Sequence, residues 1–123
     1  MYVDGFVLVV SKKKLKAYQR MAEAAGKLWM KQGALQYVES VGEDLHHGGM
    51  KIRTFMQLAK PKKGEAIVFS WILYKSKAHR NQVNARVMKD PSMSPEKMKK
   101  TPMPFDVTKM AYAGFVTLVN KKR

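Results

Sequence analysis

Four polar side chains interrupt segments that are otherwise apolar, and they are the first candidates for chemistry: Asp4, Glu39, Ser70 and Tyr112. Burying a polar group costs free energy unless the group is hydrogen-bonded, so each needs a partner or a role. Asp4 could act as a general base or anchor a ligand hydroxyl, or pair with one of the many Lys and Arg residues. Glu39 is more simply interpreted as an edge-strand surface charge. No nucleophile motif surrounds Ser70.

Two aromatic residues and one amide complete the set of candidate ligand-binding residues. Tyr112 is amphipathic and suits a pocket or an interface as well as a core. Trp71 lies two positions from Phe69, so both should share one strand face, which we expect to be core facing the helices. Asn84 can reach a ligand or satisfy a backbone group. The candidate ligand-binding residues are therefore Asp4, Ser70, Trp71, Asn84 and Tyr112.

A basic cluster at the start of a predicted helix suggests an anion site. Its members are Lys75, Lys77, His79 and Arg80. Free amides and the positive end of the helix dipole favour a phosphate or a carboxylate at such a position. The alternative is a solvated first turn, with these side chains pointing into water.

Metal and cofactor chemistry find little support in the residue pattern. His46 and His47 are neighbours that point apart in an extended chain, and no further ligand has zincin spacing, so we expect a loop pair and no metal. The chain has no cysteine, which excludes thiolate zinc sites, disulfides and cysteine nucleophiles. No phosphate loop, dinucleotide fingerprint or catalytic triad order is present, so no cofactor is expected.

Four segments have the composition of strands. Residues 2–10 and 66–74 are rich in β-branched and aromatic residues, whereas 34–42 alternates only weakly. Residues 109–119 form the last predicted strand. A further short strand is predicted at 52–56, inside the polar segment that runs from Glu43 to Gly64.

Two longer segments have helical spacing. Between residues 12 and 32 the apolar positions recur every three or four residues, at Leu15, Tyr18, Ala22, Ala25 and Trp29. Ser11 is expected to cap this helix, and Gly33 to end it. Ser76 precedes a second helix at 77–89, whose inward residues should be Val83, Val87 and Met88. One more helical turn is expected at 95–100.

The order of elements is βαββαβ, the plan of the ferredoxin-like α+β fold with an antiparallel sheet, in one domain of 123 residues. Strands 2–10 and 66–74 are apolar on both faces, but two helices can cover only one face of a four-stranded sheet. The other face would expose more apolar surface than a monomer normally tolerates. We therefore expect a homodimer joined by sheet faces about a two-fold axis.

Short motifs along nearly the whole chain carry a family resemblance. Among them are Met1-Tyr2-Val3-Asp4-Gly5-Phe6, Gly42-Glu43-Asp44-Leu45, Phe69-Ser70-Trp71 and Met103-Pro104-Phe105-Asp106. Together they resemble the YbaA-like family of small bacterial proteins. The resemblance implies a dimeric α+β barrel, a superfamily that includes cofactor-free monooxygenases and many proteins of unknown activity. It names a fold more than a reaction.

The chain is strongly basic, with 24 Lys and Arg against 9 Asp and Glu and a formal net charge of +15. Such a charge attracts nucleic acid or anionic surfaces, but the basic clusters form no single stripe and favour a solubilising role. No apolar run is long enough to span a membrane. The N-terminal order of apolar before basic residues is unlike a secretory signal, so a cytoplasmic protein without membrane contact is expected.

Three classes of function remain open. The first is a barrel that binds a small metabolite, for which an anion is one option, or acts as a cofactor-free enzyme. The second is a basic protein associated non-specifically with nucleic acid, for which no base-reading motif is present. The third is a structural dimer whose role is a protein contact.

Overall fold

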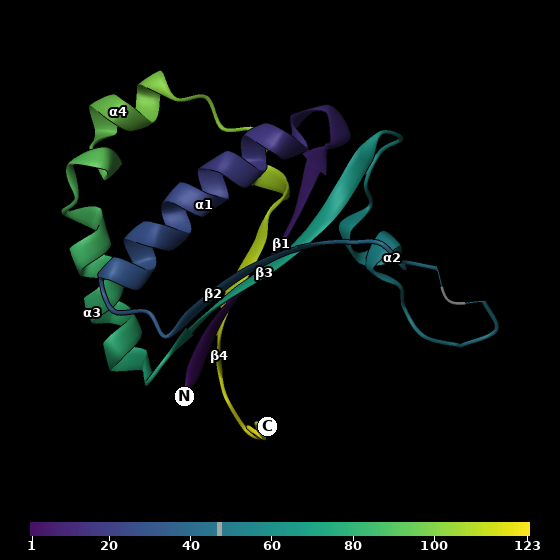
Figure 1. The fold of residues 1–123 in the computed structure, drawn as a ribbon. Coiled ribbons are helices and arrows are strands. Elements are labelled where there is room, and N and C mark those ends of the chain that lie inside the picture. Colours follow the sequence, from purple (N-terminus) through teal and green to yellow (C-terminus); the bar gives the residue numbers. More distant parts are fainter. Residues whose placement is uncertain (47) are drawn as a thin grey trace.

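A computed structural model describes residues 1–46 and 48–123; His47, one of the two loop histidines, lies outside the described residues. The described chain is an α+β fold, as predicted (Figure 1). Its strands are β1 (Tyr2–Ser11), β2 (Gln36–Val41), β3 (Glu65–Tyr74) and β4 (Ala111–Val116), and its helices are α1 (Leu15–Lys31), α2 (Phe55–Ala59), α3 (Lys77–Met88) and α4 (Pro95–Lys100).

The four strands form one antiparallel sheet in the order β2-β3-β1-β4, with β2 and β4 at the edges. This is the ferredoxin-like arrangement that the element order predicted. Asp4 on β1 is opposite Ile72 on β3, and Ser70 on β3 is opposite both Phe6 on β1 and Glu39 on β2. Side chains alternate between the two faces, so this register decides which of them meet.

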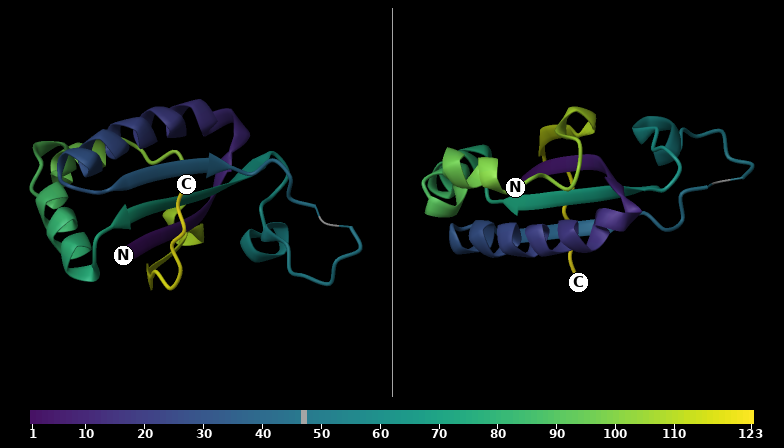
Figure 2. Two further views of the ribbon diagram at one scale, coloured as in Figure 1. Left: turned by 60° about the horizontal axis from the view of Figure 1, so that its bottom comes forward. Right: turned by 90° about the horizontal axis from the view of Figure 1, so that it is seen from above.

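The helices α1, α3 and α4 lie on one side of the sheet, and the small helix α2 lies on the other (Figures 1 and 2). Two clusters of buried residues fill the space under α1 and α3. The first contains Tyr2, Ala34, Ile72, Tyr74, Val83 and Val87, and the second contains Leu8, Val10, Tyr18, Ala22 and Val68. The core of the described chain is therefore the helix-facing side of β1 and β3.

The prediction that Trp71 and Phe69 face the helices is wrong. Val68, Ile72 and Tyr74 belong to the two helix-side clusters, and strand alternation places Trp71 and Phe69 on the opposite face. Phe69 instead meets Phe55 of α2 edge to face, with 6.0 Å between ring centroids. Both faces of β3 are apolar, so its composition did not distinguish them.

The short strand predicted at 52–56 is also wrong, because this segment begins a helix. The Thr54 hydroxyl accepts from the Gln57 amide at 3.2 Å, and the Gln57 side chain accepts from the Thr54 amide at 2.9 Å. These reciprocal bonds form a capping box, which satisfies two backbone donors at the start of α2. The hydrogen bonds of the cap therefore favour a helix here, although the composition of the segment favours a strand.

The other helix ends follow the predictions in part. Ser76 caps α3 by accepting from the His79 amide at 3.1 Å, and Gly33 follows α1 with a φ of 115°, which favours glycine. Ser11 makes no side-chain capping bond, and a 3₁₀ turn at Lys12–Lys14 precedes α1. Met88 is exposed rather than inward. None of the helices described is both long and apolar enough to cross a bilayer.

Candidate functional site

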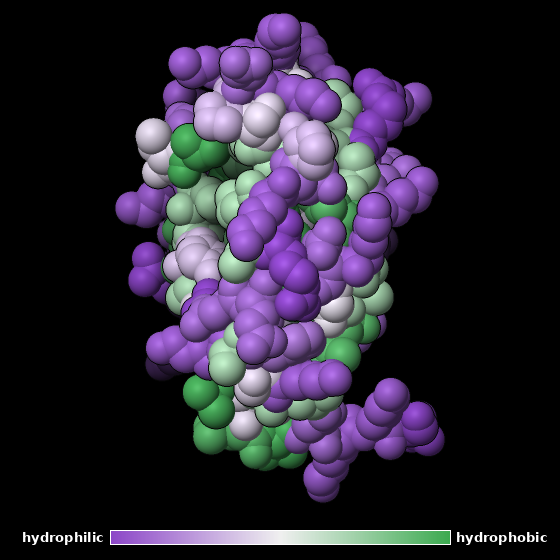
Figure 3. Space-filling model, turned by 90° about the vertical axis from the view of Figure 1, so that its left-hand side faces the viewer, coloured by the Kyte–Doolittle hydropathy of each residue, from purple (hydrophilic) through white to green (hydrophobic). Residues whose placement is uncertain are grey.

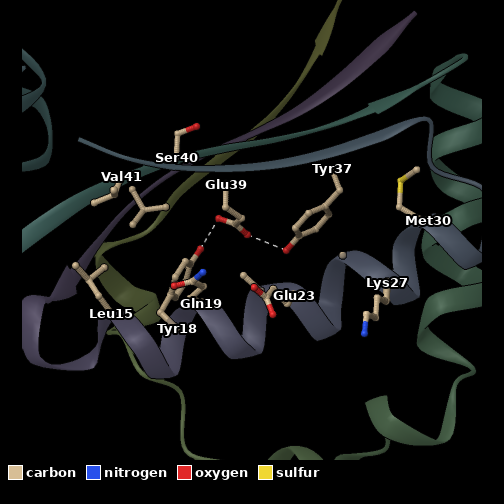
Figure 4. Close-up of a pocket in the computed structure, with 13 residues that line it drawn as sticks. Leu15, Tyr18, Gln19, Glu23, Lys27, Met30, Tyr37, Glu39, Ser40 and Val41 are labelled. Carbon is tan, nitrogen blue, oxygen red and sulfur yellow. Dashed lines mark hydrogen bonds between the residues drawn. The ribbon is translucent and has the colours of Figure 1, made fainter. Parts of the chain in front are cut away.

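A groove of about 780 Å³ runs between α1 and the edge strand β2 on the helix side of the sheet (Figure 4). This volume lies within the range of small-molecule sites, about 300–1,000 Å³. Most of its lining is apolar or small, with a few polar groups among them. The lining residues are Leu15, Tyr18, Gln19, Ala22, Glu23, Gly26, Lys27, Met30, Tyr37, Glu39, Ser40, Val41 and Val68.

Glu39 is the polar centre of this groove, so its interpretation as an edge-strand surface charge is wrong. Its carboxylate is partly buried and faces α1. The Tyr18 hydroxyl donates to Oε1 at 2.6 Å, and the Tyr37 hydroxyl donates to Oε2 at 2.8 Å. Burial, reinforced by the neighbouring Glu39, raises the pKa of both tyrosines above the usual value, so both remain protonated donors.

Gly26 makes room for this arrangement on α1. A Cβ placed there would lie 3.0 Å from Cδ1 of Tyr37, closer than side chains normally approach. With only hydrogen at this position, the Tyr37 ring can lie against the helix backbone, and its hydroxyl reaches Glu39. Tyr18, Ala22 and Gly26 are the buried residues of α1 and follow one another at intervals of four, on one helical face.

A second polar cluster joins β1, α3 and β4. Arg80 Nη1 donates to Asp4 Oδ1 at 3.1 Å and to the Tyr112 hydroxyl at 2.7 Å, and the guanidinium lies 5.0 Å from the centroid of the Tyr2 ring. Burial raises the pKa of Asp4, opposed chiefly by the charge of Arg80. Arg80 Nε is buried and has no hydrogen-bond partner in the described chain.

Asn84, on the next turn of α3, fixes two aromatic residues of the core. Its Oδ1 accepts from Trp29 Nε1 at 3.1 Å and from the Tyr74 hydroxyl at 3.3 Å. Burial and the charge of nearby Asp4 raise the pKa of Tyr74, so its hydroxyl stays protonated and donates to Asn84. The structure thus places Asp4, Tyr112 and Arg80 in one hydrogen-bonded cluster, with Asn84 on the next turn of α3.

The remaining candidates lie elsewhere. Ser70 is buried on the helix side of β3, and Trp71 is on the opposite face. At the start of α3, Lys75 and Lys77 are exposed, whereas His79 Nδ1 accepts from the Lys75 amide at 3.0 Å. Arg80 is turned inward to Asp4. Two of the four residues proposed for anion binding therefore already have partners within the chain.

None of the nine residues proposed from the sequence for ligand or anion binding lines the groove. Glu39 was noticed as a polar residue in a strand, but its edge position suggested solvent. Two patterns in the sequence could have indicated the groove. Tyr37 and Glu39 share one strand face, and a tyrosine, an alanine and a glycine occur at helical spacing on α1. Only the register of β2 beside α1 connects the two patterns.

The positive charge is distributed over the surface rather than gathered at either site. Exposed basic residues occur on several elements and loops, among them Lys16, Lys31, Lys63, Lys77 and Lys99. On the side that carries α3 and α4, hydrophilic side chains spread across the face with smaller apolar patches between them (Figure 3). This distribution agrees with the absence of a single basic stripe in the sequence.

The sheet order and helix placement define a ferredoxin-like α+β protein. A crystal structure of an uncharacterized NIPSNAP domain protein from Burkholderia xenovorans superposes with a TM-score of 0.53 over 100% of both chains, at 13% sequence identity. This similarity concerns the fold alone.

The chain belongs to the family described as protein of unknown function (DUF1428), whose family model matches residues 1–107. It is 40% identical over 120 residues to the uncharacterized protein YbaA of Escherichia coli strain K12, covering 98% of each chain. YbaA of Shigella flexneri matches to the same extent. The YbaA-like resemblance seen in the sequence motifs is therefore confirmed.

Proposed function

We propose that this chain forms a homodimeric α+β barrel that binds a small organic molecule in the groove between α1 and β2. Glu39 is the residue that orients the ligand. One observation carries the proposal: a carboxylate held by two tyrosine hydroxyls at 2.6 and 2.8 Å lines a groove that is large enough for a metabolite and mostly apolar.

The composition of the groove supports a binding role. Ligand sites combine a predominantly apolar lining with a few placed polar groups that set orientation. Here Leu15, Met30 and Val68 supply apolar surface, and Glu39 supplies acceptors whose position is set by hydrogen bonds from two different elements. A side chain held in this way needs little reordering when a ligand binds, which reduces the entropic cost of association.

The outer face of the sheet supports the homodimer. Phe69 is 44% exposed and Phe115 is 57% exposed on this face, although Phe55 of α2 packs against Phe69. Contiguous exposed apolar surface on a sheet is typical of an interface. A second copy offers the same apolar face, and a two-fold axis would bury both at once.

Native mass spectrometry of gently purified protein tests the binding role. We expect wild-type protein to retain a small molecule, or to take one up from a metabolite extract. Gly26→Val, which places methyl groups against the Tyr37 ring, should lose this adduct. Ala24→Val, at an exposed position of the same helix, should keep it. Wild-type protein that shows no adduct under either condition, or an adduct that persists in Gly26→Val, would contradict groove binding.

A further inference from the structure

The Glu39 carboxylate has no cationic partner among the residues that the structure describes. In residues 1–46 and 48–123 the one ion pair within 4.0 Å joins Arg80 and Asp4, and none involves Glu39 or its groove neighbour Glu23. The protein carries 24 Lys and Arg against 9 Asp and Glu, so cations are abundant. A partly buried carboxylate left without one is an unbalanced charge, which a ligand of opposite charge would stabilise.

The hydrogen bonds that Glu39 already makes leave acceptor capacity free. An ionised carboxylate offers about four lone-pair positions on its two oxygens. Tyr18 and Tyr37 each occupy one, on Oε1 and Oε2 respectively. Both donors are neutral hydroxyls, so they hold the carboxylate in place without compensating its charge. A further donor entering from the groove can therefore bind to either oxygen.

The lining of the groove contains more acidic than basic residues, although the protein as a whole is basic. Two of the 9 acidic residues line it, Glu23 and Glu39, but only one of the 24 basic residues does, Lys27. Figure 4 shows the amino group of Lys27 directed away from Glu39. The two carboxylates against one ammonium in the lining disfavour an anion beside Glu39, although the net charge of +15 would attract one to the surface in general.

We propose that the groove binds an organic amine: a protonated amino group on Glu39 and an apolar body against Leu15 and Val68, which pack in one cluster at the same end of the groove. The inference rests on the proposed function and specifies the class of its ligand. An ammonium supplies the missing positive charge and up to three donors. Charge-assisted hydrogen bonds are about twice as strong as neutral ones, so an amine should be preferred over an alcohol of the same shape.

Two matched series of small molecules test the class of ligand. The first comprises phenethylamine, phenethyl alcohol and phenylacetate, and the second comprises hexylamine, hexanol and hexanoate. Each is titrated into the wild-type chain and followed by amide NMR shifts. We expect the amines to shift the resonances of Tyr18, Tyr37 and Glu39, and to bind about tenfold more tightly than the alcohols, a difference of about 1.4 kcal/mol. The carboxylates should bind most weakly.

A charge-removing variant and a matched control identify the residue responsible. Glu39→Gln keeps the length of the side chain and an oxygen acceptor, and it should abolish the preference for the amine while leaving alcohol binding within about twofold. Glu43→Gln removes the same charge from an exposed position outside the groove lining, and the preference should persist.

The outcomes separate the two proposals. Alcohols that bind in the groove as tightly as amines would overturn the amine class and leave groove binding intact. A preference for amines that survives in Glu39→Gln would also overturn it, because the charge would then lie elsewhere. If no member of either series shifts the groove resonances at millimolar concentration, both the amine class and the proposed function fail.

Discussion

Arg80 and Asp4 form an ion pair, 3.1 Å between Nη1 and Oδ1, that joins α3 to β1 across 76 positions of the sequence. Asp4 is 2% exposed and the Arg80 side chain 15%. The same Nη1 donates to Tyr112, so one nitrogen connects a helix with two neighbouring strands. This geometry describes a tether that holds α3 on the sheet, and it makes the stability of the fold sensitive to either partner.

Removing the cation should therefore destabilise the protein strongly. Arg80→Met leaves Asp4 buried without a counter-charge, and we expect the free energy of unfolding to fall by about 3–5 kcal/mol. Denaturant unfolding measures the change, with Arg20→Met, at an exposed position on α1, as the control. The double variant Asp4→Leu with Arg80→Met should recover much of the loss. A loss no greater than in Arg20→Met would contradict the tether.

The stability of the protein should depend on pH through Asp4. Burial raises the pKa of this carboxyl in the folded state above its unfolded value. Its contribution to stability is then complete below the unfolded pKa and is lost as pH rises through the folded pKa. Unfolding free energies of wild-type and Asp4→Asn protein between about pH 4 and 7 should differ by an amount that declines with rising pH. The opposite slope would mean that Arg80 outweighs burial.

Crowding the contact between α1 and Tyr37 should also be costly. Gly26→Val forces a side chain into the space of the Tyr37 ring, and overpacking of this kind costs about 1–3 kcal/mol. Ala24→Val, exposed on the same helix, changes helix propensity only and should cost about 0.5 kcal/mol. Thermal or denaturant midpoints compare the two. Equal losses would show that Tyr37 does not rest on the helix at Gly26.

The proposed dimer should dissociate when charge is placed on the outer sheet face. We expect light scattering of the wild-type chain at micromolar concentration to give about twice its mass of 14.1 kDa. Phe115→Glu should give the mass of a single chain. Met88→Glu, on the helix side, is the matched control because Met88 is 58% exposed and Phe115 57%. Circular dichroism should show both variants folded. A wild-type monomer, or a Phe115→Glu dimer, would contradict sheet-face association.

The position of Trp71 in the structure changes the effect that we expect from truncating it. If Trp71 were a core residue facing the helices, its truncation to Ala would lower the free energy of unfolding by about 3–5 kcal/mol. On the outer face, only partly buried, it belongs to the surface proposed for the dimer. Trp71→Ala should therefore weaken association more than it lowers the stability of an isolated chain, as sedimentation at several concentrations would measure. A pure loss of stability at constant mass would contradict this assignment.

Local patterns were sufficient for the four strands of the sheet, the helices α1, α3 and α4, and their order. The spacing of Leu15, Tyr18 and Ala22 predicts α1, the composition of 66–74 predicts β3, and Ser76 marks the start of α3, each because periodicity and capping are properties of a few neighbouring residues. The helix α2 was within reach of the same reasoning, since Thr54 and Gln57 have the spacing of a capping box. The composition of 52–56 instead predicted a strand, and that prediction is wrong.

The groove depended on contacts between distant segments. Glu39 is a surface charge by its position in an edge strand, and it becomes the polar centre of a groove only because Tyr18, 21 positions away, approaches it on α1. Likewise, β3 is apolar on both faces, and the choice of the face that meets the helices was made by packing around Ile72 and Tyr74. In a strand, neighbouring side chains point to opposite faces of the sheet. The elements that cover the sheet decide which of these faces is buried.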